Sequence, residues 1–225
     1  MNHAPYWSDG AVTLYHGDCR EITGWVAADV LVTDPPYGIG WKRGDNFHRS
    51  SKSHPGIAGD EDTSLRDAAL ALWGTKAAAV FGSFYAPFPP NLRQILVWRK
   101  PPDSGVVGSV LRWRRDVEPV FLIGTWPRCN DKQTSVLSSA ARLQGSPSGL
   151  SSRYGHPHAK PVDVLETLIA AAPPGIVADP FAGSGSTLIA ARNQGRQCIG
   201  VELEERYCET AALRLSQGDL FGAAT

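Results

Sequence analysis

The sequence of 225 residues lacks the features that mark several protein classes. No apolar run approaches the roughly 18 residues of a transmembrane helix. The N-terminal MNHAPYWSDG has no basic segment followed by an apolar one, as a secretory signal would have. The four cysteines are scattered without a CxxC pair, which argues against a disulfide framework or a zinc site. We therefore expect a cytoplasmic protein with no membrane association and no metal.

The sequence also lacks a net charge, because 22 basic side chains balance 22 acidic ones. The balance conceals an uneven distribution along the chain. Asn91–Lys160 holds 11 Lys and Arg against 4 Asp and Glu, which gives +7, and the other residues together carry −7. A basic middle segment in an acidic chain indicates a face that binds a polyanion, although a basic surface without a partner has the same composition.

Short apolar runs alternate with helical patterns along the chain, which is long enough for one α/β domain. Strands that alternate with helices form a mostly parallel sheet with helices on both faces, and we count seven strands. The expected strands are Val12–His16, Val30–Thr33, Ala77–Phe81, Gln94–Trp98, Val120–Ile123, Ile176–Ala178 and Gln197–Val201. The expected helices are Ser64–Trp73, Val162–Ala172, Ser186–Gln194 and Glu204–Leu215.

Two long segments rich in Gly, Ser and basic residues interrupt this pattern, Gly38–Gly59 and Gln133–Gly155. Loops of this length inside a compact domain are usually functional or disordered. Their small polar residues bury too little apolar surface to become ordered alone. We expect both segments to be mobile in the free protein; the alternative is a plain linker.

The segment GIVADPFAGSGSTLIAARNQGRQCIGVELEERY (Gly175–Tyr207) has the order strand, glycine loop, helix, strand, acid. Gly183 and Gly185 allow a ligand to approach the backbone closely. Glu202 follows Gly183 by 19 residues, the approximate spacing at which an acid binds ribose hydroxyls in nucleotide sites of this kind. The segment therefore predicts a site for a ligand that contains a nucleoside.

The same segment indicates which nucleoside ligand fits. It lacks the P-loop pattern, and no Lys or Arg lies between Asp179 and Thr187 to meet a phosphate. Leu188 stands where dinucleotide sites usually have a third glycine. S-adenosylmethionine has a ribose, a positive sulfonium and no phosphate, so the charges favour it over NAD or ATP.

A second motif, VLVTDPPYGIGW, ends an apolar run in Asp34-Pro35-Pro36-Tyr37. Two prolines prevent further ladder pairing and fix the backbone, so these residues form a stiff loop at the end of a strand. Ligands of open α/β sheets bind at the carboxyl ends of the strands. We expect one crevice to receive the acids that follow expected strands, namely Asp18, Asp34, Asp179 and Glu202.

These motifs resemble those of the amino DNA methyltransferases, which methylate the exocyclic nitrogen of adenine (N6) or cytosine (N4). The catalytic loop precedes the glycine loop, an order similar to the circularly permuted beta group. The resemblance implies a Rossmann-like, permuted methyltransferase domain over residues 1–225, with a short target-recognition insertion at about 126–155. The matching segments are Asp34–Tyr37, Asp179–Thr187, LYHGDC (Leu14–Cys19), HAKP (His158–Pro161) and IGVELEERY (Ile199–Tyr207).

The resemblance implies catalysis by Asp34, Pro35, Pro36 and Tyr37. Asp34 and the Pro35 carbonyl would accept hydrogen bonds from the amine of a flipped base, and Tyr37 would stack on that base. The implied cofactor is S-adenosyl-L-methionine. The residues implied to bind it are Asp18, Cys19, Asp34, His158, Lys160, Asp179, Phe181, Ala182, Gly183, Ser184, Gly185, Ser186, Thr187 and Glu202.

The basic middle segment then has a partner, because phosphate contacts supply most of the affinity for duplex DNA. Trp113 lies among arginines, whereas Trp98 lies within a strand run and is expected in the core. We expect both long segments to become ordered on double-stranded DNA. The candidate DNA-binding residues are Lys42, Arg43, Arg49, Lys52, Arg112, Arg114, Arg115, Arg142 and Arg153.

Adenine N6 is the favoured target, because the family tends to have Asp rather than Ser before Pro-Pro-Tyr in adenine enzymes. Cytosine N4 is the first alternative. A nucleic-acid-binding module without catalysis is another, against which the intact Asp34–Tyr37 argues. An NAD-dependent oxidoreductase is disfavoured by Leu188. A homodimer and a restriction endonuclease partner both stay open.

Overall fold

The computed structural model describes residues 3–40, 57–100, 112–128, 130, 133–139 and 159–221, with side chains up to residue 217. The expectations for the two long segments therefore fall largely outside the described residues. The same holds for seven candidate site residues, which are Lys42, Arg43, Arg49, Lys52, Arg142, Arg153 and His158.

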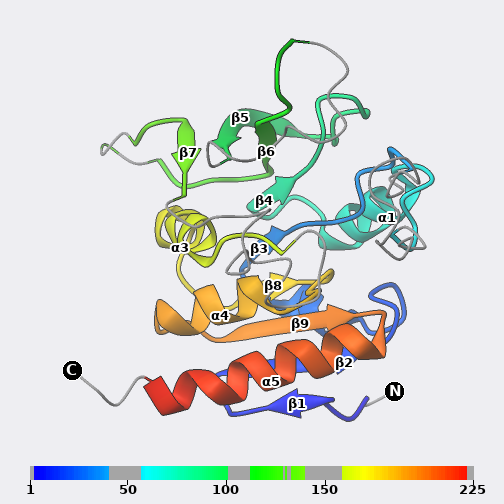
Figure 1. Cartoon of the computed structure of the whole chain (residues 1–225), viewed down its shortest axis with the longest axis vertical. Helices are drawn as coiled ribbons and strands as arrows, with labels where there is room; N and C mark the ends of the chain where they lie inside the picture. The colour runs from blue at the N-terminus through cyan, green and yellow to red at the C-terminus, as the bar shows by residue number, and fades with distance from the viewer. Residues whose placement is uncertain are drawn as a thin grey trace.

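A single sheet crosses the described part of the chain in the order β1-β2-β9-β8-β3-β4-β6-β5-β7 (Figure 1). Its central strands β2, β9, β8, β3 and β4 are parallel to one another, and β6 is antiparallel to both β4 and β5. The strands are β1 Trp7–Ser8, β2 Val12–His16, β3 Val30–Thr33, β4 Ala78–Phe81, β5 Leu92–Arg99, β6 Val117–Ile123, β7 Val136–Ser138, β8 Val177–Asp179 and β9 Cys198–Glu202.

The mostly parallel sheet is confirmed, and it has nine strands rather than seven. The two strands that the sequence did not indicate lie at the edges. β1 has two residues and β7 has three, which is too short to produce an alternating or apolar pattern. β7 also lies inside the Ser-rich segment that was expected to be a loop.

Helices cover both faces of the sheet, as expected (Figure 1). Alternate residues of β3 show why, since the side chains of a strand point to opposite faces. Val30 and Val32 pack in the core of α3, α4 and α5, whereas Leu31 packs with α1 and the short 3-10 helix η1. The bounds are α1 Ser64–Trp73, η1 Thr23–Ala27, α3 Val162–Ala171, α4 Ser186–Asn193 and α5 Glu205–Phe221. None of these helices is long and apolar enough to cross a membrane.

The pairing of β3 with β8 brings together segments that lie far apart in the sequence. Leu31 pairs with Ala178, and Asp179 pairs with Gly200 on the other side of β8. The next pair outward is His16 with Glu202. Because these strands are parallel, their carboxyl ends meet at one edge of the sheet. The loops that follow β2, β3 and β8 therefore emerge side by side.

Candidate active site

A cavity of about 750 Å³ lies at this edge. Its volume is within the range of small-molecule and cofactor sites. All four acids that follow parallel strands line it, so the expected crevice exists in the structure. The other expected site residues on its wall are Cys19, Pro35, Pro36, Tyr37, Lys160, Phe181, Ala182, Gly183, Ser184, Ser186, Thr187 and, of the DNA-binding candidates, Arg115.

Asp179 joins the glycine loop to the catalytic loop. Its Oδ1 atom accepts a hydrogen bond of 2.6 Å from Thr33 Oγ1, at the end of β3, and one of 3.1 Å from the Phe181 amide. Only 2% of the residue is exposed. Burial raises the pKa of the carboxyl to about 6, although the hydrogen bonds from Thr33 and Thr187 oppose this. The two loops are thus fixed relative to each other by one desolvated carboxylate.

Glu202 closes the other side of the glycine loop. Its Oε2 atom accepts a hydrogen bond of 2.7 Å from the Gly183 amide, and Oε1 accepts one of 2.8 Å from the Glu204 amide. Burial raises the pKa of this carboxyl. Each carboxylate oxygen has more than one lone pair, so Glu202 keeps acceptor capacity for the hydroxyls of a ligand in the cavity.

Gly185 has a structural role at the start of α4. It begins α4 with φ of +81°, and a Cβ atom built there would lie 2.9 Å from the Cβ of Ala211 in α5. It does not line the cavity, whereas Gly183 does. The expected contact of Gly185 with a cofactor stays a prediction. Close packing of α4 against α5 and a left-handed backbone require the glycine.

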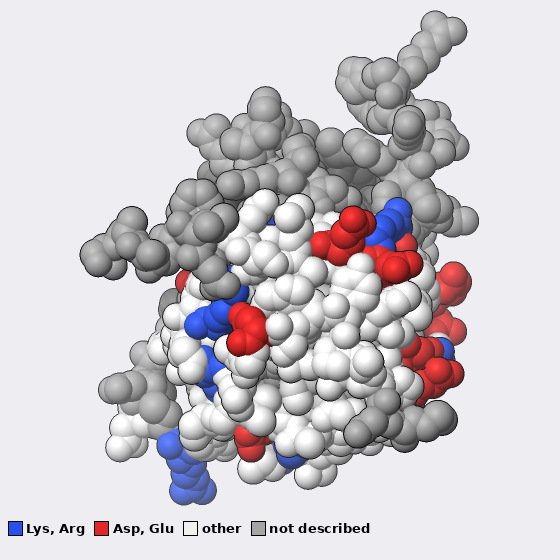
Figure 2. Space-filling view, turned by 90° about the horizontal axis from the view of Figure 1, so that it is seen from below, with Lys and Arg blue, Asp and Glu red and all other residues white. Residues whose placement is uncertain are grey.

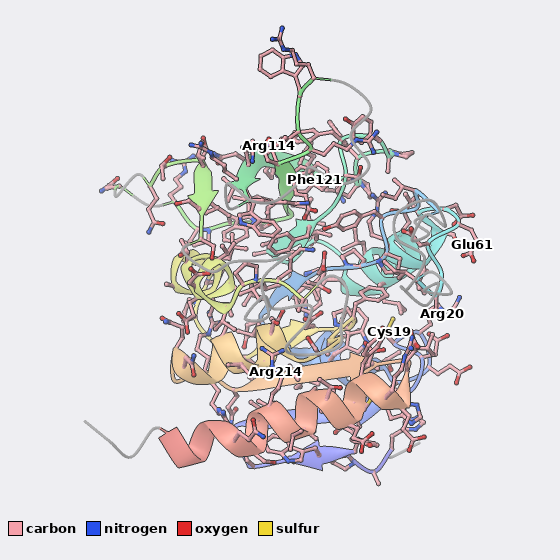
Figure 3. The ribbon with its side chains drawn as sticks, in the orientation of Figure 1. Cys19, Arg20, Glu61, Arg114, Phe121 and Arg214 are labelled. Carbon is pink, nitrogen blue, oxygen red and sulfur yellow. The ribbon has the colours of Figure 1, made fainter. Side chains whose placement is uncertain are left out.

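Arg214 of α5 supports the glycine loop from outside the cavity (Figure 3). Its guanidinium donates hydrogen bonds to the Ser184 carbonyl, to Ser184 Oγ at 3.1 Å and to Ser186 Oγ at 3.3 Å. Both hydroxyls thus already have a partner within the chain. Because Arg214 does not line the cavity, the ligand still meets a loop without a cationic side chain.

Asp34 lies in a partly buried network on the wall of the same cavity. Its Oδ1 atom accepts a hydrogen bond of 2.8 Å from the Tyr37 hydroxyl, and Oδ2 accepts one of 2.8 Å from Lys160 Nζ. Burial raises the pKa of Asp34, and the Lys160 ammonium opposes that rise. For Lys160, burial disfavours the charge, but Asp34 and Glu118 keep its pKa above the ordinary value.

Asp60 fixes the catalytic loop and was not predicted. The residue is 3% exposed. Its Oδ1 atom accepts a hydrogen bond of 2.8 Å from the Gly38 amide, and its carbonyl accepts one of 2.7 Å from the Gly40 amide. These bonds join the residues just after Tyr37 to the residues just before α1. No local pattern in the sequence connects Asp60 to Gly38, because the contact spans 22 positions.

Asp18 forms its main contacts locally. Its carboxylate pairs with Arg20, which also donates its amide to Oδ1 at 2.8 Å. The hydrogen bond from the Arg20 side chain lowers the pKa of Asp18. Cys19 is buried beside it, and burial raises the pKa of the thiol to about 12, so this cysteine stays a neutral part of the wall. Within the described residues, no group of His, Cys, Asp and Glu side chains is arranged to hold a metal ion.

The arginine candidates divide between the cavity and the surface. The Arg115 guanidinium lies at the cavity, 5.3 Å from the ring centre of Tyr85, and Tyr85 is 77% exposed. Arg114 pairs with Asp116 at 3.5 Å, near the start of β6 (Figure 3). Trp113 is 80% exposed, in contrast to Trp98, which is buried against Phe81 as expected. An exposed aromatic and basic surface thus borders the cavity.

The opposite end of the molecule has a different surface. Figure 2 views it from the side of α5 and β1 and shows Lys and Arg only as small, separate groups among the described residues. Arg114 lies at the β5 and β6 end instead (Figure 3).

The fold and the cavity define a class of protein. A largely parallel sheet with a glycine loop, and with acids at the carboxyl ends of its strands, is the arrangement of an enzyme that binds a nucleoside-containing cofactor. The sequence profile of a family described as DNA methylase matches residues 72–213. The chain belongs to this N6/N4 DNA methylase family, which confirms the resemblance seen in its motifs.

Known proteins agree with this assignment. The protein YubD of Escherichia coli (strain K12) is 33% identical over 214 residues, which cover 89% of this chain and 88% of YubD. The crystal structure of M1.HpyAVI in complex with S-adenosylmethionine has a TM-score of 0.61 at 22% identity and covers 91% of this chain and 98% of its own. PvuII DNA methyltransferase, which is cytosine-N4-specific, has a TM-score of 0.65 at 17% identity, with 94% and 89% covered. At these identities the two structures establish the fold.

Proposed function

We propose that this protein transfers the methyl group of S-adenosylmethionine to the exocyclic N6 of adenine in duplex DNA. The observation that carries the proposal is one cavity that contains both the glycine loop with Glu202 and the Asp34–Tyr37 loop. A cofactor on the first and a base on the second would meet within it. The bound S-adenosylmethionine in M1.HpyAVI, a structure of the same fold, supports the choice of cofactor.

The chemistry requires an acceptor at Asp34. An exocyclic amine is a poor nucleophile because its lone pair is delocalised into the ring. Its nitrogen becomes positive as the S–CH₃ bond breaks and the N–CH₃ bond forms, and it must then release a proton. Asp34 and the Pro35 carbonyl would accept the two N–H groups, and the carboxylate would stabilise the developing charge by electrostatics and orientation.

The cofactor end of the cavity has the charges that this ligand requires. Asp179 and Asp34 bring negative charge toward a sulfonium, while the Gly183 backbone allows close approach of the methionine part. Glu202 would accept the ribose hydroxyls. Asp18, which lines the same cavity, would lie at the adenine. Lys160 serves Asp34 rather than a phosphate, because its ammonium is already shared between carboxylates.

Duplex DNA would approach over the arginines that precede β6. Arg115 and the exposed ring of Tyr85 lie at the cavity, where a base that has left the helix enters. Arg112 and Arg114 continue this surface and would contact phosphates, which position the duplex without specifying its sequence.

Cytosine N4 is the second candidate target, and the likeness to the cytosine-N4-specific PvuII enzyme favours it. Two experiments test the proposal. Calorimetric titration with S-adenosylmethionine and with NAD identifies the cofactor, and we expect only the former to bind. Mass spectrometry of nucleosides from DNA treated with enzyme and cofactor identifies the base. N6-methyldeoxyadenosine supports the proposal, N4-methyldeoxycytidine replaces it by the second candidate, and unmodified DNA contradicts both.

A further inference from the structure

A second carboxylate, Glu118, faces the Asp34 network from a different part of the sheet. It lies on β6, which runs antiparallel to β4, so the beginning of β6 reaches the edge where the parallel strands end. Its side chain is 15% exposed and lines the cavity. Neither the catalytic loop nor the glycine loop contains it, and the mechanism above does not use it.

Glu118 shares both of the groups that bind Asp34. The Tyr37 hydroxyl lies 3.1 Å from Glu118 Oε2 and 2.8 Å from Asp34 Oδ1. Lys160 Nζ lies 3.5 Å from Glu118 Oε2 and 2.8 Å from Asp34 Oδ2. The other oxygen of Glu118 pairs with Lys100 Nζ at 2.5 Å. The two carboxylates therefore hold one ammonium and one phenol between them.

The surroundings of Lys160 show why the sharing of its ammonium affects the charge at Asp34. The residue is 7% exposed, and its Nζ atom lies 5.3 to 5.7 Å from the ring centres of Tyr37, Phe81 and Trp98. Aromatic faces attract a cation but do not neutralise its charge. Lys160 therefore divides its charge between two carboxylates, of which Glu118 also pairs with Lys100. Without Glu118, the ammonium would neutralise Asp34 alone.

We propose that Glu118 is a positioning residue for methyl transfer: it draws Lys160 and the Tyr37 hydroxyl partly away from Asp34, so that the carboxylate of Asp34 is less neutralised when it meets the amine. The inference rests on the proposed function. In the transition state the amine nitrogen becomes positive. With Glu118 present, this nitrogen meets more negative charge than it would without Glu118. Tyr37 also keeps a fixed hydroxyl, which orients the ring against the base.

The pH dependence separates this role from a merely structural one. The groups that face Asp34 are Lys160, Tyr37 and Glu118, and Asp179 is a further acid of the same cavity. Lys100, which follows β5, faces Glu118. Glu118 contributes to raising the pKa of Asp34, whereas Lys160 lowers it. Removing the charge of Glu118 therefore lowers the pKa of Asp34. The acid limb of the rate profile, where Asp34 becomes protonated, should move to lower pH.

The experiment is single-turnover methyl transfer to unmethylated duplex DNA with excess enzyme, between about pH 5 and 9. We compare wild type with Glu118→Gln, Glu118→Asp and the control Glu61→Gln, an exposed glutamate beside α1 (Figure 3). We expect Glu118→Gln to lower the plateau rate roughly tenfold to a hundredfold. Its acid limb should move to lower pH while the affinity for S-adenosylmethionine and the melting temperature stay close to wild type. Glu118→Asp should recover part of the rate.

Two results would overturn the inference while leaving the proposed function intact. One is a Glu118→Gln enzyme as fast as wild type. The other is a slower enzyme whose acid limb has not moved, or whose loss of rate is matched by a loss of cofactor affinity, since packing alone would explain it. A wild-type enzyme that transfers no methyl group to DNA would instead overturn the proposed function, and the inference with it.

Discussion

Replacing Asp34 with alanine should abolish methyl transfer without abolishing cofactor binding. The side chain is the only carboxylate in the Asp34–Tyr37 loop, and it accepts hydrogen bonds from Tyr37 and Lys160 within the cavity. A lost charged acceptor in a desolvated site raises the barrier by about 3 kcal/mol or more. That corresponds to a rate at least roughly a hundredfold lower.

The same structure predicts what the variant retains. Lys160 loses its nearer partner but keeps Glu118 at 3.5 Å, so its charge is not left isolated. We expect a loss of stability of about 1–3 kcal/mol, less than for an unpaired buried ammonium. Glu202 and the Gly183 amide contact each other across the glycine loop, independently of Asp34. Affinity for S-adenosylmethionine should therefore stay within a few-fold of wild type.

The assay combines single-turnover transfer to unmethylated DNA with calorimetric titration of the cofactor and a thermal melt. Glu61→Ala is the matched control, because this acid is exposed and lies outside the cavity. A folded Asp34→Ala enzyme with near-normal turnover would refute the assignment of Asp34. Equal losses of turnover and cofactor affinity would show that the two ends of the cavity are not separate.

Three further predictions test other parts of the structure. Gly185→Ala should be less stable than Gly195→Ala by about 1–2 kcal/mol in urea unfolding. Both positions have positive φ, but only a side chain at position 185 would crowd Ala211. Equal stabilities of the two variants would contradict the packing argument. For Asp179, the pKa of about 6 lies above the ordinary value of 3.8, so the folded state binds its proton more tightly and this carboxyl contributes less stability as pH rises through 6. Asp179→Asn should then be more stable than wild type at pH 8, by up to about 3 kcal/mol, yet bind S-adenosylmethionine more weakly; a destabilised variant would show that the charge itself is required for folding. Replacing Arg112, Arg114 and Arg115 with alanine should weaken binding to all DNA sequences alike. It should also flatten the slope of log affinity against log salt concentration, which we expect to be about −4 to −5 for wild type; a wild-type slope near zero would contradict phosphate contacts. Replacements within Gln133–Gly155 should instead alter which sequence is methylated.

The sequence was sufficient to locate the four acids that converge on the cavity. Each follows a strand that is long enough or apolar enough to recognise, and parallel strands bring their carboxyl ends to one edge whatever the order of the chain. The glycine loop was recognisable for the same reason, because its strand, helix and second strand are adjacent in the sequence. What remained hidden was the reason for Gly185, since α5 contacts it from 26 residues away.

Glu118 and Asp60 show why the remaining part of the site could not be predicted. Glu118 begins an antiparallel strand, and only the direction of that strand in the sheet brings it to the edge where the others end. Asp60 contacts Gly38 across a segment whose sequence has no regular pattern. Burial was easier to predict, because Trp98 lies within an apolar strand run and is in the core as expected, whereas Trp113 lies between Arg112 and Arg114 and is exposed.

The most direct test of the account is the fate of a labelled methyl group. The wild-type protein is incubated with S-adenosylmethionine that carries a tritiated methyl group and with duplex DNA from a host without methylation, and the DNA is digested to nucleosides. The account predicts label in N6-methyldeoxyadenosine with wild type and none with Asp34→Ala. Unlabelled DNA with a folded wild-type protein that binds the cofactor, or equal labelling by the Asp34→Ala variant, would contradict it.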